Sequence, residues 1–204
     1  MLRTTQFQNE YYYHIYNRGV DKRKVFLDKQ DYSRFLISTQ EFNQDQPIGG
    51  LSRILKDPVL REGLDPKINL VNIIAYCLNP NHFHLLLKQN TESGISNFMH
   101  KIQMGYTNYF NNKYQRSGVL WQGKYKAKEV KSTYGLIKLS VYVNCNAEIH
   151  NIAKKEEWPW SSYKKQQVKA ILSEFKNIKE YIEFCNELIP EIKAIKNLEK
   201  YGLE

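Results

Sequence analysis

Residues 68–88 read INLVNIIAYCLNPNHFHLLLK, and this stretch decides the fold class. The run from Ile68 to Leu78 is apolar and rich in β-branched residues, which predicts a buried strand. The Asn-Pro-Asn sequence at 79–81 predicts a tight turn. The segment from His82 to Lys88 predicts a second strand, antiparallel to the first. The centre of the chain is therefore expected to be a β-hairpin.

The segments on both sides of the hairpin alternate between helix and strand. The predicted elements, in chain order, are a strand at 11–17, a helix from Asp28 or Asp31 to about 43, the two strands of the hairpin, a helix at 93–114, a strand at 119–130 and a helix at 133–146. This order matches the split βαβ pattern of ferredoxin-like α+β domains. We therefore expect an antiparallel sheet with helices packed on one face and the other face free for a ligand.

The remaining segments predict one domain with an appendage. Residues 44–68 are rich in proline and glycine and are interpreted as a long surface insertion with a single helical turn. Loops of this length are usually functional or mobile. The motif WPWSSY at 158–163 is expected to cap the core. We expect a domain over 1–165 and a helical C-terminal extension over 166–204, with its helix interrupted at Pro190.

The composition favours a protein that binds a polyanion. The 204-residue chain is 42% hydrophobic, has a net charge of +9 and contains 15 tyrosines, many of them near lysine or arginine. Cations contact phosphates and aromatic rings stack on bases, so this mixture is typical of a groove for single-stranded nucleic acid. More than half of the tyrosines are nevertheless expected in the core or at its rim.

Location and redox state follow from what the sequence lacks. No stretch approaches the ~20 apolar residues of a membrane helix, and the N-terminus has no apolar secretory segment. Cys77, Cys145 and Cys185 are widely spaced and form no CxxC pair, which supports neither a disulfide framework nor a zinc knuckle. We therefore expect a cytoplasmic protein with reduced cysteines and no membrane partner.

His82 and His84 are candidate metal ligands. Residues two apart in a strand point to the same face, so the two imidazoles would lie side by side while Phe83 points into the core. Paired imidazoles can bind a metal ion. The alternative is a pair of hydrogen-bonded surface histidines, and the motif alone leaves both interpretations open.

Tyr142 and Asn146 form a second candidate pair. They are four residues apart in the predicted helix and therefore share a face. The phenol can act as a nucleophile and the carboxamide as a third ligand to Mg²⁺ or Mn²⁺. A tyrosine–asparagine pair at this spacing also arises by chance, so spacing alone does not decide its role.

Several motifs in order resemble the HUH endonucleases, in particular the single-tyrosine transposases of the IS200 type and their REP-associated relatives. The matching segments are YHIYNRG at 13–19, NPNHFHLL at 79–86, RSGVLWQGKY at 116–125, YVNCNA at 142–147 and WPWSSY at 158–163. The resemblance covers roughly residues 10–165, which makes the domain over 1–165 a transposase-like catalytic domain. The sequence departs from the family at Ala147, where a proline is usual.

The resemblance implies a reaction and the residues that carry it. Tyr142 corresponds to the nucleophile, and His82, His84 and Asn146 to the metal ligands. Single-stranded or hairpin DNA would be cleaved and rejoined by metal-assisted transesterification through a 5′-phosphotyrosine, with Mg²⁺ or Mn²⁺ as cofactor. Tyr134, eight residues before Tyr142, is the alternative nucleophile. Related transposases include dimers and monomers, so a homodimer stays an open alternative.

Two other classes compete with this interpretation. One is a non-catalytic DNA- or RNA-binding protein of the same fold, which would need neither the histidine pair nor the tyrosine–asparagine pair. The other is a ferredoxin-like RNA-binding module, whose aromatic ribonucleoprotein motif is not evident. Cleavage without a covalent adduct would instead indicate a metal hydrolase that uses water.

Polar residues near these motifs are candidates for DNA contact. They are Asn17, Arg18, Lys22, Arg23, Arg116, Gln122, Lys124 and Lys126. For any single cation a solvated surface position is an equally ordinary interpretation. Among the other histidines, His14 is expected to pack or contact DNA, His100 to be a surface residue, and His150 to lie near a helix end or contact a phosphate.

Overall fold

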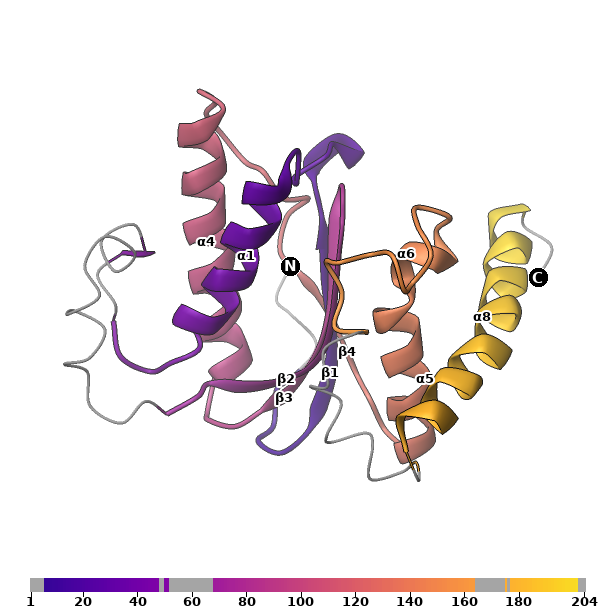
Figure 1. Cartoon of the computed structure of the whole chain (residues 1–204). Helices are drawn as coiled ribbons and strands as arrows, with labels where there is room; N and C mark the ends of the chain where they lie inside the picture. The colour runs from indigo at the N-terminus through magenta and orange to yellow at the C-terminus, as the bar shows by residue number, and fades with distance from the viewer. Residues whose placement is uncertain (1–5, 48–49, 52–67, 164–174, 176, 202–204) are drawn as a thin grey trace.

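A computed structural model describes residues 6–47, 50–51, 68–163, 175 and 177–201. Its centre is a four-stranded sheet of order β2-β3-β1-β4 in which each neighbouring pair is antiparallel. The strands are β1 (Tyr12–Arg18), β2 (Val71–Asn79), β3 (His82–Gln89) and β4 (Lys126–Glu129). This topology confirms the expected ferredoxin-like α+β fold, and Figure 1 shows the sheet nearly edge-on between two helical layers.

The central hairpin is formed as predicted. Asn79 pairs with His82, so a two-residue loop, Pro80 and Asn81, joins β2 to β3. Side chains alternate along β3 between two faces. Phe83 and its odd-numbered neighbours lie in one hydrophobic cluster, whereas Leu86 lies in another on the opposite face.

The first face is covered by α1 (Lys29–Glu41) and α4 (Gly94–Lys113), and we call it the α4 face. Both candidate caps of α1 are used. The Asp28 carboxylate accepts from the Asp31 backbone N–H, and the Asp31 side chain accepts from the Asp28 backbone in return. Such a capping box satisfies donors that the first turn of a helix otherwise leaves unpaired. The cluster beneath is largely aromatic, with Phe83 packed against Phe35.

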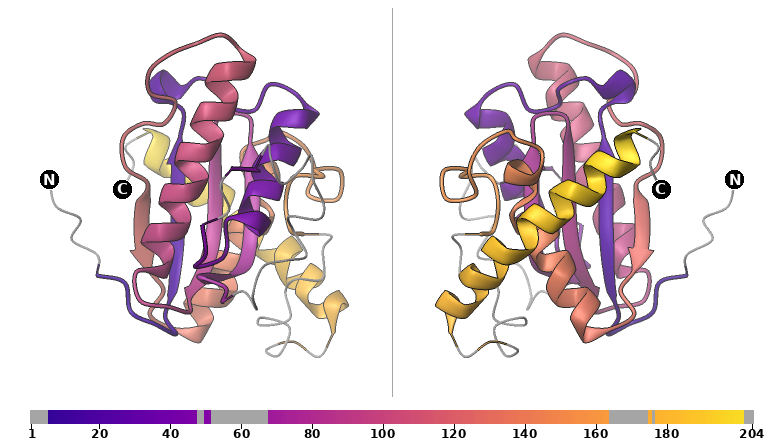
Figure 2. Two further views of the ribbon diagram at one scale, coloured as in Figure 1. Left: turned by 90° about the vertical axis from the view of Figure 1, so that its left-hand side faces the viewer. Right: turned by 90° about the vertical axis from the view of Figure 1, so that its right-hand side faces the viewer.

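The second face carries α5 (Thr133–Asn144), α6 (Asn146–Ile149) and α8 (Ile178–Tyr201), and we call it the α5 face. Figure 2 shows α8 running across this side of the molecule, opposite α4. α5 packs on β2 and β3, and α8 packs on α5. The expectation that helices cover one face and leave the other free therefore needs correction, because apolar residues such as Ile74 and Leu86 on the α5 face are buried.

Two predicted elements are shorter than expected. The strand predicted at 119–130 is regular only in β4, because the preceding chain bends where Gly118 (φ 83°) and Gly123 (φ 67°) adopt left-handed conformations. The helix predicted at 133–146 ends at Asn144, and Cys145 (φ −98°, ψ 12°) separates it from α6. Tyr142 and Asn146 thus lie on two consecutive helices.

The C-terminal extension also differs from the expectation. Pro190 lies inside α8 and does not interrupt it, although a proline lacks the N–H that would bond back to residue 186. The part of the predicted tail before 175 and most of the predicted insertion at 44–68 lie outside the described residues. Tyr181 and Cys185 of α8 are buried against α5, so the extension shares a core with the sheet.

The remaining predictions concern the cysteines, the closing motif and membrane spans. All three cysteines are buried and unpaired. The Trp158 indole N–H donates to the Leu78 carbonyl at 3.0 Å, and Trp160 stacks on Tyr32, so the WPWSSY motif does close the α4 side of the core. Within the described ranges no helix is long and apolar enough to cross a membrane.

Candidate active site

The two candidate histidine ligands lie at the start of β3 on the α5 face. His84 is buried and His82 is half-buried. Their rings are 5.1 Å apart, centroid to centroid. Their shared face follows from the strand alternation that buries Phe83 on the α4 face. The expected geometry of the His-Phe-His motif is therefore present.

The hydrogen bonds of His82 define its tautomer. Its Nδ1 lies 2.6 Å from Oδ1 of Asn81. The Asn81 amide is oriented by its own Nδ2, which donates to the Lys22 carbonyl at 3.2 Å. An amide oxygen only accepts, so Nδ1 of His82 carries the proton. Nε2 of the neutral ring is then left with a free electron pair.

That electron pair faces the amide of Asn146. His82 Nε2 and Asn146 Oδ1 are 3.4 Å apart, and both are acceptors. Asn79 lies between them, because its Nδ2 donates to His82 Nε2 at 2.9 Å and to Asn146 Oδ1 at 2.6 Å. Two acceptors that face each other need an electropositive group between them, and here the Asn79 amide supplies it.

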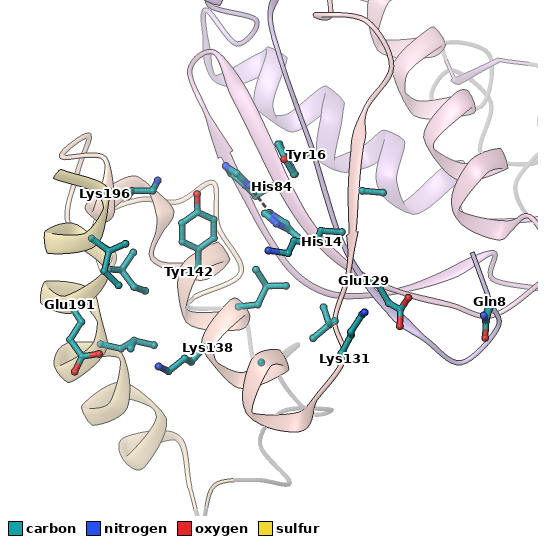
Figure 3. A pocket seen from close by; sticks show the side chains of 18 of the residues that line it. Gln8, His14, Tyr16, His84, Glu129, Lys131, Lys138, Tyr142, Glu191 and Lys196 are labelled. Carbon is teal, nitrogen blue, oxygen red and sulfur yellow. Dashed lines mark hydrogen bonds between the residues drawn. The ribbon is translucent and has the colours of Figure 1, made fainter. Parts of the chain in front are cut away.

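His84 is oriented by a third histidine. His14 on β1 lies beside it, with His14 Nε2 and His84 Nδ1 hydrogen-bonded at 2.8 Å (Figure 3). Tyr16 stacks on both rings, at 4.9 Å from His14 and 5.7 Å from His84. His14 therefore packs as expected, and it also fixes the direction of the His84 imidazole.

The site keeps its imidazoles neutral. Burial, together with the neighbouring His150, lowers the pKa of His82 to about 4. Burial, with His14 and His82 nearby, lowers the pKa of His84 well below its ordinary value. Burial, together with Lys128, lowers the pKa of His14 to about 4. Neutral imidazoles retain the electron pairs that a metal ion requires.

Tyr142 lies against this histidine cluster. Its ring meets His84 edge-on at 5.4 Å and His14 at 5.8 Å. Figure 3 shows its hydroxyl directed toward the histidine side of the cleft. The alternative nucleophile, Tyr134, is 61% exposed and contacts Lys138, whose Nζ is 4.7 Å from its ring centroid. The geometry brings Tyr142, rather than Tyr134, to the histidines.

A pocket of about 570 Å³ joins these groups to some of the predicted DNA contacts. It is lined by His82, His84 and Tyr142, and also by Arg18, Gln122 and Lys126. Arg18 Nε donates to Gln122 Oε1 at 2.9 Å. Of the eight predicted DNA-contact residues, these three have exposed side chains that line the pocket of the histidines.

The other predicted DNA contacts have different surroundings. Asn17 lines the same pocket but is buried, and its Nδ2 donates to the Gly123 carbonyl at 3.1 Å. Lys124 lines a separate pocket together with the exposed His100. Arg116 donates to Asn111 Oδ1 at 2.9 Å. Lys22 and Arg23 lie exposed at the short 3₁₀ helix η1 (Val20–Lys22) and its C-cap.

Several residues of the site were not singled out by sequence reasoning. Asn79 and Asn81 had been interpreted only as turn residues, yet both contact His82, and their positions beside the His-Phe-His motif were the available signal. His150 lies at the end of α6 as expected, 5.4 Å from the His82 ring. Lys196 of α8 lines the same pocket, and no local sequence signal indicates this.

The donor set of the site is mixed. Among the described residues, no group of three or more His, Cys, Asp or Glu side chains is placed to hold a metal ion. The candidate ligands of this site are two imidazoles and one amide oxygen, that of Asn146, so they do not form such a group. Asn146 is fully buried, and its Nδ2 has no hydrogen-bond partner within the described part of the chain.

A ferredoxin-like sheet that presents a histidine–hydrophobic–histidine strand to a helix-borne tyrosine is the arrangement expected of the HUH class. The family model described as "Transposase IS200 like" matches residues 66–146, which contain the hairpin, α4, β4 and α5. The chain is thus similar to the IS200-like transposases over this segment, in which the candidate histidines and Tyr142 lie. The family resemblance inferred from the motifs is thereby confirmed.

A solved structure shows the same fold. A REP-associated tyrosine transposase bound to a REP hairpin superposes with a TM-score of 0.58 at 13% identity, covering 84% of this chain and 88% of that one. A protein from Deinococcus radiodurans R1, described as a candidate transposase, gives a TM-score of 0.40 at 14% identity, covering 76% and 99%. The second score is too low to carry an argument. No curated protein matches the chain.

Proposed function

We propose that this protein is an IS200-like transposase that cleaves and rejoins single-stranded DNA with Tyr142 as its nucleophile. The observation that carries the proposal is the convergence of two neutral imidazoles and a tyrosine on one pocket lined also by cations, with the buried amide oxygen of Asn146 beside one imidazole. A protein that only binds DNA needs neither the imidazoles nor the tyrosine nor the amide at this position.

The reaction follows from the chemistry of a phenol next to a phosphodiester. Tyr142 Oη would attack phosphorus, so that one O–P bond forms to the tyrosine and the bond from phosphorus to the 3′-oxygen breaks. The phenolic proton leaves and the departing 3′-oxygen gains one, so no net proton or energy source is consumed. A 3′-hydroxyl attacking the 5′-phosphotyrosine reverses these steps and rejoins the strand.

His82, His84 and Asn146 fit a divalent cation, Mg²⁺ or Mn²⁺. The electron pairs of His82 Nε2 and Asn146 Oδ1 converge across 3.4 Å, and their present bridge, Asn79 Nδ2, is itself electropositive. His14 and Asn81 orient the two imidazoles through their second nitrogens, as partners of metal-bound histidines commonly do. A bound cation would polarise the phosphoryl oxygen and neutralise charge that develops on it.

The substrate is expected to be a strand that leaves a DNA hairpin. The structural relative bound to a REP hairpin supports this choice. Arg18, Gln122 and Lys126 would contact the backbone or bases near the scissile phosphate, because they line the pocket that holds Tyr142. Lys22 and Arg23 would contact phosphates farther along the strand. We assign catalysis to a domain over 1–165, which α8 of the extension completes by packing on α5.

The test is a covalent-adduct assay. The protein is incubated with Mn²⁺ and end-labelled hairpin DNA carrying single-stranded flanks, drawn from a library of flank sequences, and the products are separated on a denaturing gel. The proposal expects a metal-dependent protein–DNA band that Tyr142→Phe abolishes and the matched control Tyr134→Phe retains. An adduct that persists in Tyr142→Phe contradicts the nucleophile. Binding across the library without any adduct would instead favour the non-catalytic protein of the same fold.

A further inference from the structure

The last turns of α8 bring a lysine to the candidate active site from outside the family-matched segment 66–146. Lys196 lines the pocket of about 570 Å³ that holds the histidines, and also a larger neighbouring pocket of about 1300 Å³ between β4, α5 and α8. Figure 3 shows its side chain extending from α8 toward Tyr142. The C-terminal extension therefore contributes a wall and a charge to the site.

The contacts of Lys196 place its ammonium beside the nucleophile. Its Nζ donates to His150 Nε2 at 2.7 Å and lies 4.8 Å from the centroid of the Tyr142 ring. His150 in turn lies against His82. The ammonium is thus held on the nucleophile side of the histidine cluster by an imidazole nitrogen and an aromatic ring.

The charge of Lys196 is not balanced by any carboxylate that the structure describes. Within the described ranges Lys196 has no carboxylate within ion-pair distance, whereas cations such as Lys113 and Lys155 do. The smaller of its two pockets contains Arg18 and Lys126 as well and no acidic side chain among its described lining residues, whereas Glu129 and Glu191 line the larger one. Several cations that line one pocket without acidic partners in it are the arrangement that an anionic ligand stabilises.

We propose that Lys196 binds a non-bridging oxygen of the scissile phosphate as Tyr142 attacks it. The inference rests on the proposed function and adds to it a phosphate-binding residue supplied by α8. An ammonium beside the attacking phenol compensates the charge that the phosphoryl oxygens carry through the reaction. The imidazole of His150 holds Lys196 in place by accepting its hydrogen bond.

A matched pair of lysines makes the test specific. Lys193 lies one turn earlier on α8, and its Nζ donates to Asn151 Oδ1 at 3.1 Å, outside both pockets. The variants are Lys196→Met, Lys196→Arg and the control Lys193→Met, each checked by thermal unfolding. Single-turnover adduct formation is measured at saturating DNA, so that weaker binding does not imitate slower chemistry.

The expected result is a loss of rate in Lys196→Met of about 10²-fold, the usual scale for removing one transition-state donor. Lys196→Arg should recover most of that rate, and Lys193→Met should equal the wild type. Equal rates in Lys196→Met and the wild type, or equal losses in Lys196→Met and Lys193→Met, would overturn the inference while leaving the proposed function intact.

A binding experiment separates the contact from the chemistry. In the Tyr142→Phe background, affinities are compared for DNA with a normal scissile phosphodiester and with an uncharged methylphosphonate there. Lys196→Met should weaken binding of the charged DNA by about 10-fold, the scale of a charge-assisted hydrogen bond, and leave binding of the uncharged DNA unchanged. If Lys196→Met weakens binding of the charged DNA alone while the wild type forms no covalent adduct, the phosphate contact is supported and only the proposed chemistry is refuted. Equal weakening for both DNAs refutes the contact.

Discussion

Asn79 offers a test of the candidate metal centre that does not depend on activity. Its side chain is fully buried, and its Nδ2 is the shared donor to His82 Nε2 and Asn146 Oδ1. Replacing it with alanine removes both hydrogen bonds and leaves two facing acceptors without a partner. A lost hydrogen bond costs about 1 kcal/mol, and a buried acceptor left unsatisfied costs about 1–3 kcal/mol.

We therefore expect Asn79→Ala to lower the free energy of unfolding by about 2–4 kcal/mol. For a chain of this size that corresponds to a fall in Tm of about 5–15 °C. The matched control is Asn72→Ala on the same strand, whose exposed side chain accepts a hydrogen bond from Asn90. The control should change the unfolding free energy by less than about 0.5 kcal/mol.

Divalent cations should partly rescue the variant. A cation between His82 and Asn146 supplies the electropositive partner that Asn79 no longer provides, and binding to the folded state alone raises its stability. Tm is measured by differential scanning fluorimetry with EDTA and with increasing Mn²⁺. Two results would refute the reasoning. One is that Asn79→Ala has the same Tm as the wild type in EDTA. The other is that Mn²⁺ raises the Tm of Asn79→Ala no more than it raises the Tm of Asn72→Ala.

Three further predictions concern stability and DNA binding. The Lys113 ammonium beside Asp28 lowers the pKa of that carboxyl below 3.8, so its stabilising effect is present above about pH 4 and lost as the pH falls through the folded-state value. Acid unfolding followed by circular dichroism should therefore lose this part of its pH dependence in Asp28→Asn, and an unchanged profile would contradict it. Gly94→Ala should destabilise the protein by about 1–3 kcal/mol in urea titrations, because a Cβ there would lie 2.3 Å from the Leu70 carbonyl oxygen; wild-type stability would show that the backbone shifts freely. Arg18→Ala should weaken DNA binding and reduce the slope of log K against log salt by about 1, whereas an unchanged slope would place Arg18 away from phosphates.

Much of the fold was predictable because its signals are local. The apolar run at 68–78 and the turn at 79–81 determined the hairpin, and the helical spacing of aromatic residues determined α1 and α4. The strand predicted at 119–130 failed because Gly118 and Gly123 permit left-handed backbone that a count of apolar residues does not register. The α5 face is covered by α5 and α6, and α8 packs on these helices through contacts that are distant in sequence.

The candidate site also contains residues that local sequence signals predict and residues that only distant contacts bring together. His82 and His84 were predictable because a two-residue period fixes their common face. Tyr142 and Asn146 do lie near these histidines, although Cys145 ends α5 between them. The orienting partners were harder to predict, because His14 reaches the site through strand pairing and Lys196 through helix packing. The catalytic roles assigned to the residues of the site stay predictions that the assays above test.

The two-residue turn of the central hairpin sets the register of β3, and with it the faces to which the core residues and the site residues point. Successive side chains of β3 serve opposite faces, with Phe83 in the aromatic core and His82 and His84 at the pocket. Shifting a strand by one residue moves every side chain to the other face. We expect that one residue inserted between Asn79 and His82 would turn the two imidazoles toward the hydrophobic interior and the Phe83 ring toward the pocket. Inactive protein and misfolded protein would then arise from the same error, so selection for a stable core also maintains the orientation of the imidazoles.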